Sequence, residues 1–275
     1  MPGKRIHLLV FFSLLIFLFT TGCNSDLLGL FRSTDLDERL KEQNNFKFLR
    51  HEDRNISVGE EYSFIVVSDT HIENGNTFGL EKLKDVIAAD SSIKFAVITG
   101  DITQNGSRKD IETFITLARS LGIPCYPVIG NHDIYFDNWT HWKNLIGSTR
   151  YRINGDGTTL FMLDSANLFF GKEQLDWLER EIKKTQGRVF VFTHVNLFSI
   201  SPVIIQQLPD VRERARLISI LSGRCDIMFM GHNHHGSTRE TGGVIFLTAE
   251  SFIDNKIYYL VSVTKTGISY KQQHF

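Results

Sequence analysis

Aspartate, asparagine and histidine side chains recur directly after short apolar runs of this chain. The motifs in which they stand are Asp69-Thr70-His71, Gly100-Asp101, Gly130-Asn131-His132-Asp133, Thr193-His194 and Gly231-His232-Asn233-His234. Carboxylate and amide oxygens together with imidazole nitrogens form a mixed ligand set that suits Zn, Mn, Fe or Mg. The set is too large for one tetrahedral ion with an open position. It fits two ions about 3.5–4 Å apart that share one carboxylate.

The apolar patterning predicts a scaffold that would bring these motifs together. Strands are expected over residues 63–67, 93–98, 124–129, 150–154, 160–163, 189–193, 226–230, 244–247, 257–263 and 268–271, and helices over 78–89, 107–121, 137–146, 172–184 and 208–221. The strand–helix–strand order of the first half favours parallel strands joined by helical crossovers. The motifs then fall at the carboxyl ends of strands, the edge where open α/β sheets bind ligands.

Spacing within the motifs supports this convergence. Asp69 and His71 stand two residues apart, as do His232 and His234, so each pair points to one side of an extended segment. Glycine precedes Asp101 and begins two of the later motifs, and it allows the tight turns that bring backbone close to a ligand.

In this order the motifs resemble those of the calcineurin-like metallophosphoesterase superfamily, over a span from about residue 64 to residue 235. Residues 163–165 and 174–179 are similar to the branch that includes bacterial cyclic-nucleotide phosphodiesterase-like proteins. The resemblance implies a mixed α/β fold, a four-layer α/β/β/α sandwich with metals at the carboxyl ends of the strands.

The resemblance also implies a role for each motif residue. It assigns a first metal to Asp69, His71 and His234, a second metal to Asn131, His194 and His232, and a bridging position to Asp101. His132 matches the residue that protonates the leaving group or stabilises the transition state, and Asp133 would orient it. The family often has proline two residues after the histidine of the fourth motif. Here Asn196 stands there, which leaves the shape of that loop open.

The expected activity is hydrolysis of a phosphate ester, either a diester or a monoester. A water molecule bridging two cations would lose a proton near neutral pH and attack phosphorus in line, while His132 protonates the leaving oxygen. The ions could be Mn, Fe, Zn, Ni or Mg. The substrate could be a small molecule or a lipid head group, and the oligomeric state is open.

Two other functions stay open at this point. One is a non-catalytic, metal-stabilised envelope lipoprotein that binds a partner or a phosphorylated ligand. The other is a DNA nuclease of the same superfamily. A net charge of −1 and a pI of about 6.8 give no overall basic field to attract nucleic acid, so we expect no nucleic-acid partner.

The first residues are typical of an export signal. Lys4 and Arg5 precede an apolar run over residues 6–19, and Thr20-Thr21-Gly22-Cys23 resembles the lipobox of bacterial lipoproteins, with Thr20 where an aliphatic residue is usual. We therefore expect a signal peptide over 1–22, a lipidated Cys23 with a polar tether over 23–60, and the catalytic domain over 61–275. An exported, membrane-anchored envelope protein follows. An uncleaved anchor, or ordinary cleavage with a free cysteine, are the alternatives.

The remaining length and composition suit a globular domain with a sizeable core: the chain has 275 residues, of which 42% are hydrophobic and 22% charged. Cys125 and Cys225 each begin an apolar run and are expected as buried thiols, with a disulfide as the alternative. Trp139 and Trp142 either wall a substrate pocket or pack a short helix onto the core. Residues 196–209 form either a lid or membrane-facing lip, or a packed loop.

Overall fold

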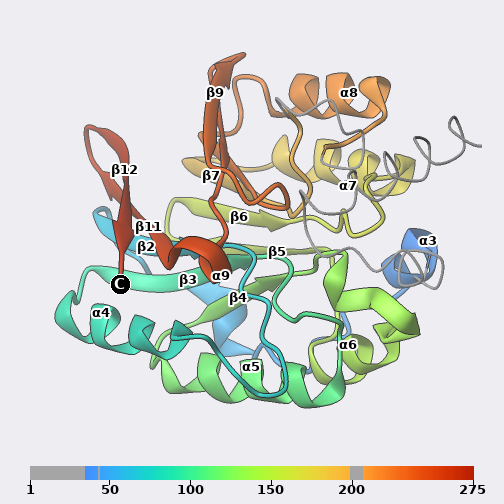
Figure 1. Ribbon diagram of the computed structural model, residues 1–275. Helices are drawn as coiled ribbons and strands as arrows, with labels where there is room; N and C mark the ends of the chain where they lie inside the picture. The colour runs from blue at the N-terminus through green and yellow to red at the C-terminus, as the bar shows by residue number, and fades with distance from the viewer. Residues whose placement is uncertain (1–34, 43, 199–206) are drawn as a thin grey trace, which may run out of the picture.

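Two β-sheets lie face to face between outer layers of helices in the computed structural model, which describes residues 35–42, 44–198 and 207–275 (Figure 1). The five-stranded sheet has the order β12 (Gly267–His274), β11 (Ile257–Thr264), β2 (Tyr62–Val67), β3 (Ile93–Thr99) and β4 (Cys125–Val128). Strands β2, β3 and β4 are parallel, and β11 and β12 extend the sheet in antiparallel register.

The seven-stranded sheet supplies the other half of the sandwich. Its order is β1 (Asn55–Ile56), β5 (Tyr151–Gly155), β6 (Thr158–Met162), β7 (Arg188–Phe192), β8 (Ile227–Met230), β10 (Val244–Thr248) and β9 (Ser237–Thr241). Strands β6, β7, β8 and β10 run parallel. Their carboxyl ends therefore meet at one edge of the sheet.

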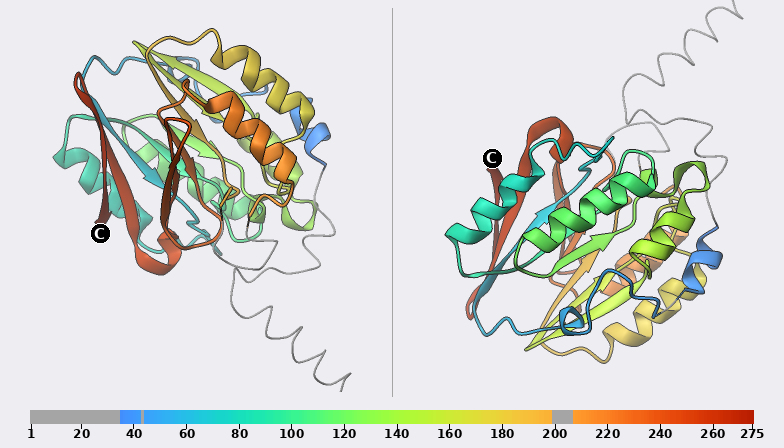
Figure 2. Two further views of the ribbon diagram at one scale, coloured as in Figure 1. Left: turned by 90° about the horizontal axis from the view of Figure 1, so that it is seen from above. Right: turned by 90° about the horizontal axis from the view of Figure 1, so that it is seen from below.

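Helices cover the outer face of each sheet. Those over the five-stranded sheet are α4 (Leu83–Ala89) and α5 (Arg108–Ser120), with α6 (Trp139–Leu145) beside α5, and those over the seven-stranded sheet are α7 (Lys172–Ile182) and α8 (Val211–Leu221). In Figure 2, the view from above has the α7–α8 layer in front, and the view from below has the α4–α5 layer in front. The predicted mixed α/β fold of two sheets and flanking helices is confirmed.

Phenylalanine rings fill the space between the sheets. Phe64 of β2 stacks on Phe95 of β3 with ring centroids 4.7 Å apart, and it meets Phe190 of β7 edge-on at 5.0 Å. Phe192 and Phe229 stack at 5.2 Å within the other sheet. These rings are fully buried, so their apolar area locks the two sheets together and fixes the relative height of their strand ends.

Helix boundaries follow local capping chemistry. Helix α5 begins after Ser107, whose hydroxyl accepts the N–H of Asp110, close to the predicted start. Helix α4 begins later than predicted: Phe78 and Gly79 have φ values of 53° and 99°, outside the helical region, and a 3₁₀ turn η2 (Leu80–Lys82) separates them from the helix.

The described part of the expected tether is instead built into the domain. Helix α3 (Leu36–Leu40) buries Leu36 and Leu40 completely or nearly so. Further on, a 3₁₀ turn η1 (Glu52–Arg54) leads into β1, which pairs with β5 in parallel. The prediction of a free polar tether over 23–60 is therefore wrong for residues 35–42 and 44–60, because apolar side chains among the charges reach the core.

A buried ion pair fixes this N-terminal segment. Nε and Nη2 of Arg39 donate to the two carboxylate oxygens of Asp164, each at 2.8 Å, and both side chains are fully buried. Asp164 follows β6, so the pair joins the segment to the same edge of the sheet at which the metal-ligand motifs stand. The expected signal peptide and Cys23 lie outside the described residues. Within the described ranges, no helix has both the length and the apolar character needed to cross a membrane.

Two smaller expectations are settled here. Cys125 and Cys225 are buried free thiols, as predicted. Trp139 and Trp142 are 3% and 1% exposed, so they pack α6 onto the core and do not wall a pocket.

Removing the buried partner of Asp164 tests the role of the N-terminal segment. We expect Arg39→Ala to lower the free energy of unfolding by about 3–5 kcal/mol, because an uncompensated carboxylate would stay buried. Urea unfolding of the purified protein measures this. The matched control is Arg108→Ala, which removes an exposed pair with Glu112 and should cost at most about 1 kcal/mol. Equal costs for the two variants would contradict the assignment of residues 35–60 to the domain.

Candidate metal centre

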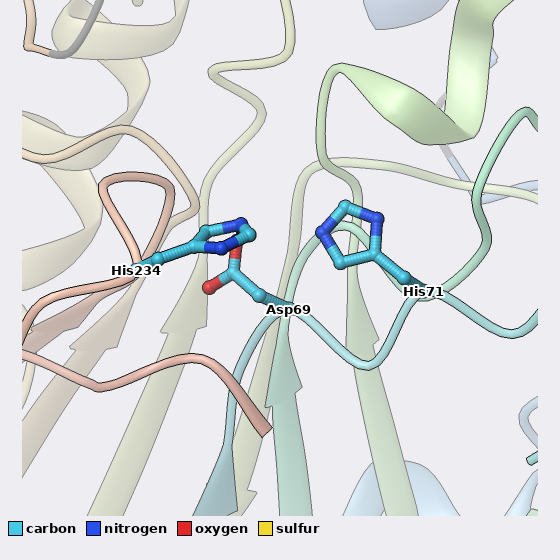
Figure 3. Close-up of side chains that lie close together, drawn as sticks. All are labelled: Asp69, His71 and His234. Carbon is cyan, nitrogen blue, oxygen red and sulfur yellow. The ribbon is translucent and has the colours of Figure 1, made fainter. Parts of the chain in front are cut away.

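The predicted ligand residues converge at the carboxyl ends of five strands. Asp69 and His71 follow β2, Asp101 follows β3, and the remaining motifs follow β4, β7 and β8. Ligand atoms within 4.8 Å of one another define three groups: Asp69 with His71 and His234, His71 with Asp101 and His132, and Asp101 with His194 and His232. Figure 3 shows the first group, in which Asp69 and His71 from the segment after β2 lie beside His234 from the loop after β8.

Asp101 lies where these groups meet. Its Oδ2 is 3.2 Å from Nε2 of His194 and 3.9 Å from Nε2 of both His71 and His132. The carboxylate is fully buried, and its other oxygen accepts the N–H of His132 at 2.9 Å. Asp101 is thus held by backbone on one side and presents Oδ2 to imidazoles on both flanks.

A second cluster of donor atoms surrounds His194. Its Nε2 is 3.1 Å from Oδ1 of Asn131 and 3.2 Å from Nδ1 of His232, in addition to its contact with Asp101. These four residues come from four different strand ends. Asn131, which sequence analysis assigned to the second ion, therefore lies with the other residues of that set.

The backbone of the motifs adopts the left-handed region at most of the ligand positions. The φ values are 53° for Asp69, 45° for His71, 47° for Asp101, 77° for His232 and 60° for His234. Non-glycine residues rarely take such values, and each costs about 1–3 kcal/mol where surrounding structure enforces it. These turns redirect the chain so that side chains two residues apart face one centre.

Two glycines allow the close approach of the loops. A Cβ at Gly100 would overlap the ring of His194, and a Cβ at Gly130 would overlap the backbone nitrogen and Oδ1 of Asp101. Any larger residue would push β3 and its neighbours apart. The glycines that begin these motifs therefore set the distance between ligands from different strands.

Contacts to the far side of the ligands fix their orientation. Nδ1 of His194 lies 2.9 Å from the carbonyl oxygen of Thr99, which leaves Nε2 directed at the centre. Nδ1 of His234 lies 2.6 Å from Oδ2 of Asp254, in the short helix α9 (Phe252–Asn255). Such partners set the ring orientation and raise the basicity of metal-binding imidazoles. Sequence analysis missed Asp254, since no local pattern connects positions 20 residues apart.

Tyr135 orients the amide of Asn131. Nδ2 of Asn131 donates to the hydroxyl of Tyr135 at 2.8 Å, which leaves Oδ1 facing His194. The Tyr135 ring also lies 4.4 Å from the ring of His132, so one side chain positions two members of the same motif. Tyr135 was absent from the sequence prediction because aromatic residues near a motif carry no specific signal.

The structure corrects the expected partner of His132. Nδ1 of His132 lies 2.8 Å from the carbonyl oxygen of Gln104, and it was expected to face Asp133. The Asp133 carboxylate instead accepts the N–H groups of Ile102, Thr103 and Gly130, at 3.2, 2.8 and 2.9 Å, and the hydroxyl of Thr103 at 2.9 Å. Asp133 thereby ties the loop after β3 to the loop after β4, while Gln104 orients the histidine.

The loop after His194 is closed at its base by the residue that replaces proline. Asn196 is fully buried, and its Oδ1 accepts the N–H of Phe198 at 2.9 Å and the hydroxyl of Thr248 at 3.2 Å. Its carbonyl oxygen accepts the N–H of Leu208 at 2.8 Å, so the two ends of the loop are side by side. Residues 199–206, which include most of the expected lid or lip, lie outside the described residues.

Burial and ion pairing have opposite effects on the pKa values of the groups at the centre. Burial lowers the pKa of His71 to about 3, which keeps this imidazole neutral and leaves a lone pair available on its unprotonated nitrogen. Burial also opposes charge on Asp101 and His194, yet their mutual attraction raises the pKa of His194 to about 9 and holds that of Asp101 well below its ordinary value. A cation bound at Nε2 of His194 would replace this proton, so metal affinity should fall as pH is lowered.

Asp133 has the opposite shift. Burial, followed by repulsion from Asp101, raises the pKa of Asp133 to about 7, although the four donated hydrogen bonds favour the ionised form. This is a further negative group at the centre that nearby positive charge would stabilise.

The residues present fit a pair of metal ions. Buried polar atoms without a hydrogen-bond partner among the described residues include both ring nitrogens of His71, Oδ2 of Asp101 and Nε2 of His132. Orphaned buried polar atoms of this kind are costly, and a bound cation would satisfy the acceptors among them. The donor set of imidazole, carboxylate and amide oxygen suits Zn, Mn, Fe or Mg.

Fold and site together define a metal-dependent phosphoesterase. A model of the family described as calcineurin-like phosphoesterase matches residues 62–236. The chain belongs to that family and is a hydrolase of its metal-dependent class. The matched span begins with β2 and ends just after the His232–His234 motif.

Two named relatives agree with this class, and a solved structure shares the fold. The chain is 28% identical over 215 residues to a probable glycerophosphodiester phosphodiesterase of Arcobacter nitrofigilis, which spans 68% of this chain and 77% of that protein. It is 29% identical over 141 residues to a probable cyclic nucleotide phosphodiesterase of Fibrobacter succinogenes, covering 46% of this chain and 54% of that one. A dimetal phosphatase from Danio rerio has a similar fold, with a TM-score of 0.62 at 14% identity, covering 78% of this chain and 96% of that one.

Substitution of Asp254 tests its support of His234. We expect Asp254→Asn to weaken the binding of one metal ion by about 10–100-fold, because the imidazole loses the carboxylate that orients it. Competition with a fluorescent chelator measures the affinity of each ion. The exposed Asp85 on α4 gives the matched control, Asp85→Asn, which should leave both affinities unchanged. Equal affinities in the two variants would show that Asp254 does not support the site.

Proposed function

We propose that the chain hydrolyses a phosphate ester with two divalent ions. The ligands divide into Asp69, His71 and His234 for one ion and Asn131, His194 and His232 for the other, with Asp101 shared. The observation that supports this most directly is the position of Asp101, whose buried Oδ2 has no hydrogen-bond partner among the described residues and faces imidazoles of both sets. A single shared carboxylate is typical of two-metal hydrolytic sites.

When bound, the two ions would supply the positive charge that lowers the pKa of a water molecule between them and neutralises the phosphoryl oxygens. The protein's own contribution to proton transfer is His132. Its Nδ1 is fixed by Gln104, so Nε2 points into the centre, 3.9 Å from Oδ2 of Asp101. In its cationic form His132 would donate the Nε2 proton to the oxygen of the leaving group. Asp133 acts as a positioning residue, because it holds together the loops that present Asp101 and His132.

A phosphodiester is the substrate that we favour. Both named relatives are phosphodiesterases by name, and this supports a diester over a monoester for the present chain.

Hydrolysis of two reporter esters tests the proposal. Purified protein is assayed with bis(p-nitrophenyl) phosphate and p-nitrophenyl phosphate, metal-free and with Mn, Fe, Zn, Ni or Mg. We expect metal-dependent turnover with a preference for the diester. His132→Ala should lower kcat by about 10²–10⁴-fold with metal binding retained, because only the proton donor is lost. Asp101→Asn should lose metal binding together with activity.

The control variant is His274→Ala, which removes an exposed histidine of β12 far along the chain from every ligand motif and should keep full activity. Metal-loaded, folded protein that turns over neither ester would favour the alternative of a non-catalytic envelope protein that binds a phosphorylated ligand. A faster rate with the monoester would contradict the preference for diesters, but not the proposal of metal-dependent phosphate-ester hydrolysis.

We further propose that the protein is exported and anchored in a bacterial membrane through a lipid on Cys23. The support is the sequence: a basic start, an apolar run over residues 6–19 and small residues before the cysteine. The domain would then begin near residue 35, at α3, and the tether would be limited to residues 24–34. An acylated N-terminal cysteine provides the multiple chains that stable anchoring needs.

Replacing the cysteine tests the anchor. In bacterial cells expressing the full chain, the wild type should fractionate with membranes and take up a labelled fatty acid. Cys23→Ser should lose the label, because the thiol at the proposed lipidation site is removed. The control Cys125→Ser changes a buried thiol of the domain and should keep the label. An unlabelled wild-type protein in the membrane fraction would instead indicate an uncleaved signal anchor.

A further inference from the structure

A cationic cavity of about 350 Å³ lies apart from the metal centre. Strand β5, helix α7 and the N-terminal segment around the start of β1 form its walls, and none of its lining residues is a ligand candidate. Three arginines line it: Arg54, Arg150 and Arg152. Glu181 is the one acidic residue among its lining residues, so the arginines exceed the acidic groups by two charges (three minus one).

Two of the guanidinium groups are held against aromatic rings. The Arg54 guanidinium lies 5.1 Å from the centre of the Phe46 ring, and that of Arg150 lies 5.0 Å from the centre of the Trp177 ring. Stacking of this kind holds a planar guanidinium by its face, whereas its hydrogen bonds are made at its edge. The side chains therefore lose little conformational freedom when a ligand arrives.

Two of the three arginines form ion pairs, and Arg54 keeps a donor that no described residue satisfies. Arg152 donates to Glu181 at 2.8 Å, and Arg150 donates to Glu173 at 3.3 Å. The Glu173 side chain is 64% exposed, whereas that of Arg150 is only 5% exposed. Arg54 makes no ion pair within the described ranges, and its buried Nε has no hydrogen-bond partner there. A buried donor of this kind favours an acceptor from outside the chain.

We propose that this cavity is a second phosphate site, which binds inorganic phosphate or the phosphate group of a small ester. Arg54 reaches the cavity from the N-terminal segment, whereas Arg150 and Arg152 reach it from β5 and its start. A tetrahedral phosphate can accept from guanidiniums on both sides at once, and it matches their paired N–H geometry. The volume suits a small polar ligand such as phosphate or glycerol phosphate.

Calorimetric titration of the metal-loaded protein with inorganic phosphate and with glycerol 3-phosphate tests the site. Wild-type protein should show two binding events, one at the metal centre and one in the cavity. Asp101→Asn should keep only the cavity event. Arg54→Gln should weaken the cavity event by about tenfold or more and keep the other, because a charge-assisted hydrogen bond is lost. The matched control Arg108→Gln, on exposed α5, should keep both.

A second variant and a second ligand source complete the test. Arg152→Gln should also weaken the cavity event, which guards against a folding defect specific to Arg54→Gln, and changes in Trp177 fluorescence report directly from the cavity wall. Vesicles that contain phosphatidylglycerol distinguish a lipid phosphate from a free one. The lipid would be assigned if wild-type protein binds vesicles but not soluble phosphate, and Arg54→Gln does not bind vesicles. Identical binding of all probes by wild type, Arg54→Gln and Arg152→Gln would overturn the proposal. This readout does not need catalysis, so inactivity toward reporter esters would not affect it.

Discussion

The interaction on which this structure depends is the attraction between buried carboxylates and the cations that must neutralise them. Asp69 and Asp101 are fully buried at the ends of adjacent parallel strands. Charges removed from water are expensive unless opposite charge and hydrogen bonds compensate. Imidazoles around Asp101 supply part of this compensation, and its orphaned oxygen leaves room for more. The rest of the architecture holds these groups in place despite the free-energy cost of burying their charges.

Backbone amides do much of that holding. The N–H of His132 donates to Asp101, and the N–H of His232 donates to Asp69 at 3.2 Å. Each carboxylate is therefore hydrogen-bonded to the loop that presents another ligand. Asp133 extends the same principle, since its oxygens join two loops through their N–H groups. The ligands are therefore positioned as one network, and a change in any strand end should be felt by the others.

Sequence predicted the parts of the molecule whose signals are local. Buried strands such as β3 and β7 are continuous apolar runs, and the motifs stand directly after them. Strand β9 was missed because its residues are largely exposed and polar, and β1 because two residues show no periodicity. The segment around Arg39 was taken for a tether because its charges suggested solvent, whereas its partner lies 125 residues away. Asp254 and Gln104 are also long-range partners, which only the fold reveals.

The left-handed turns at the ligand positions bear on how such a chain changes over generations. At Asp69, His71 or Asp101, glycine would adopt the left-handed backbone with less strain than the residue now present. Asparagine would adopt it with about the same strain as the present residue. Selection for stability alone would thus favour replacements that remove ligands, while the phenylalanine-filled interior stayed intact. The metal centre persists only under selection for its chemistry, so descendants released from that selection should keep the sandwich and lose its metal ligands.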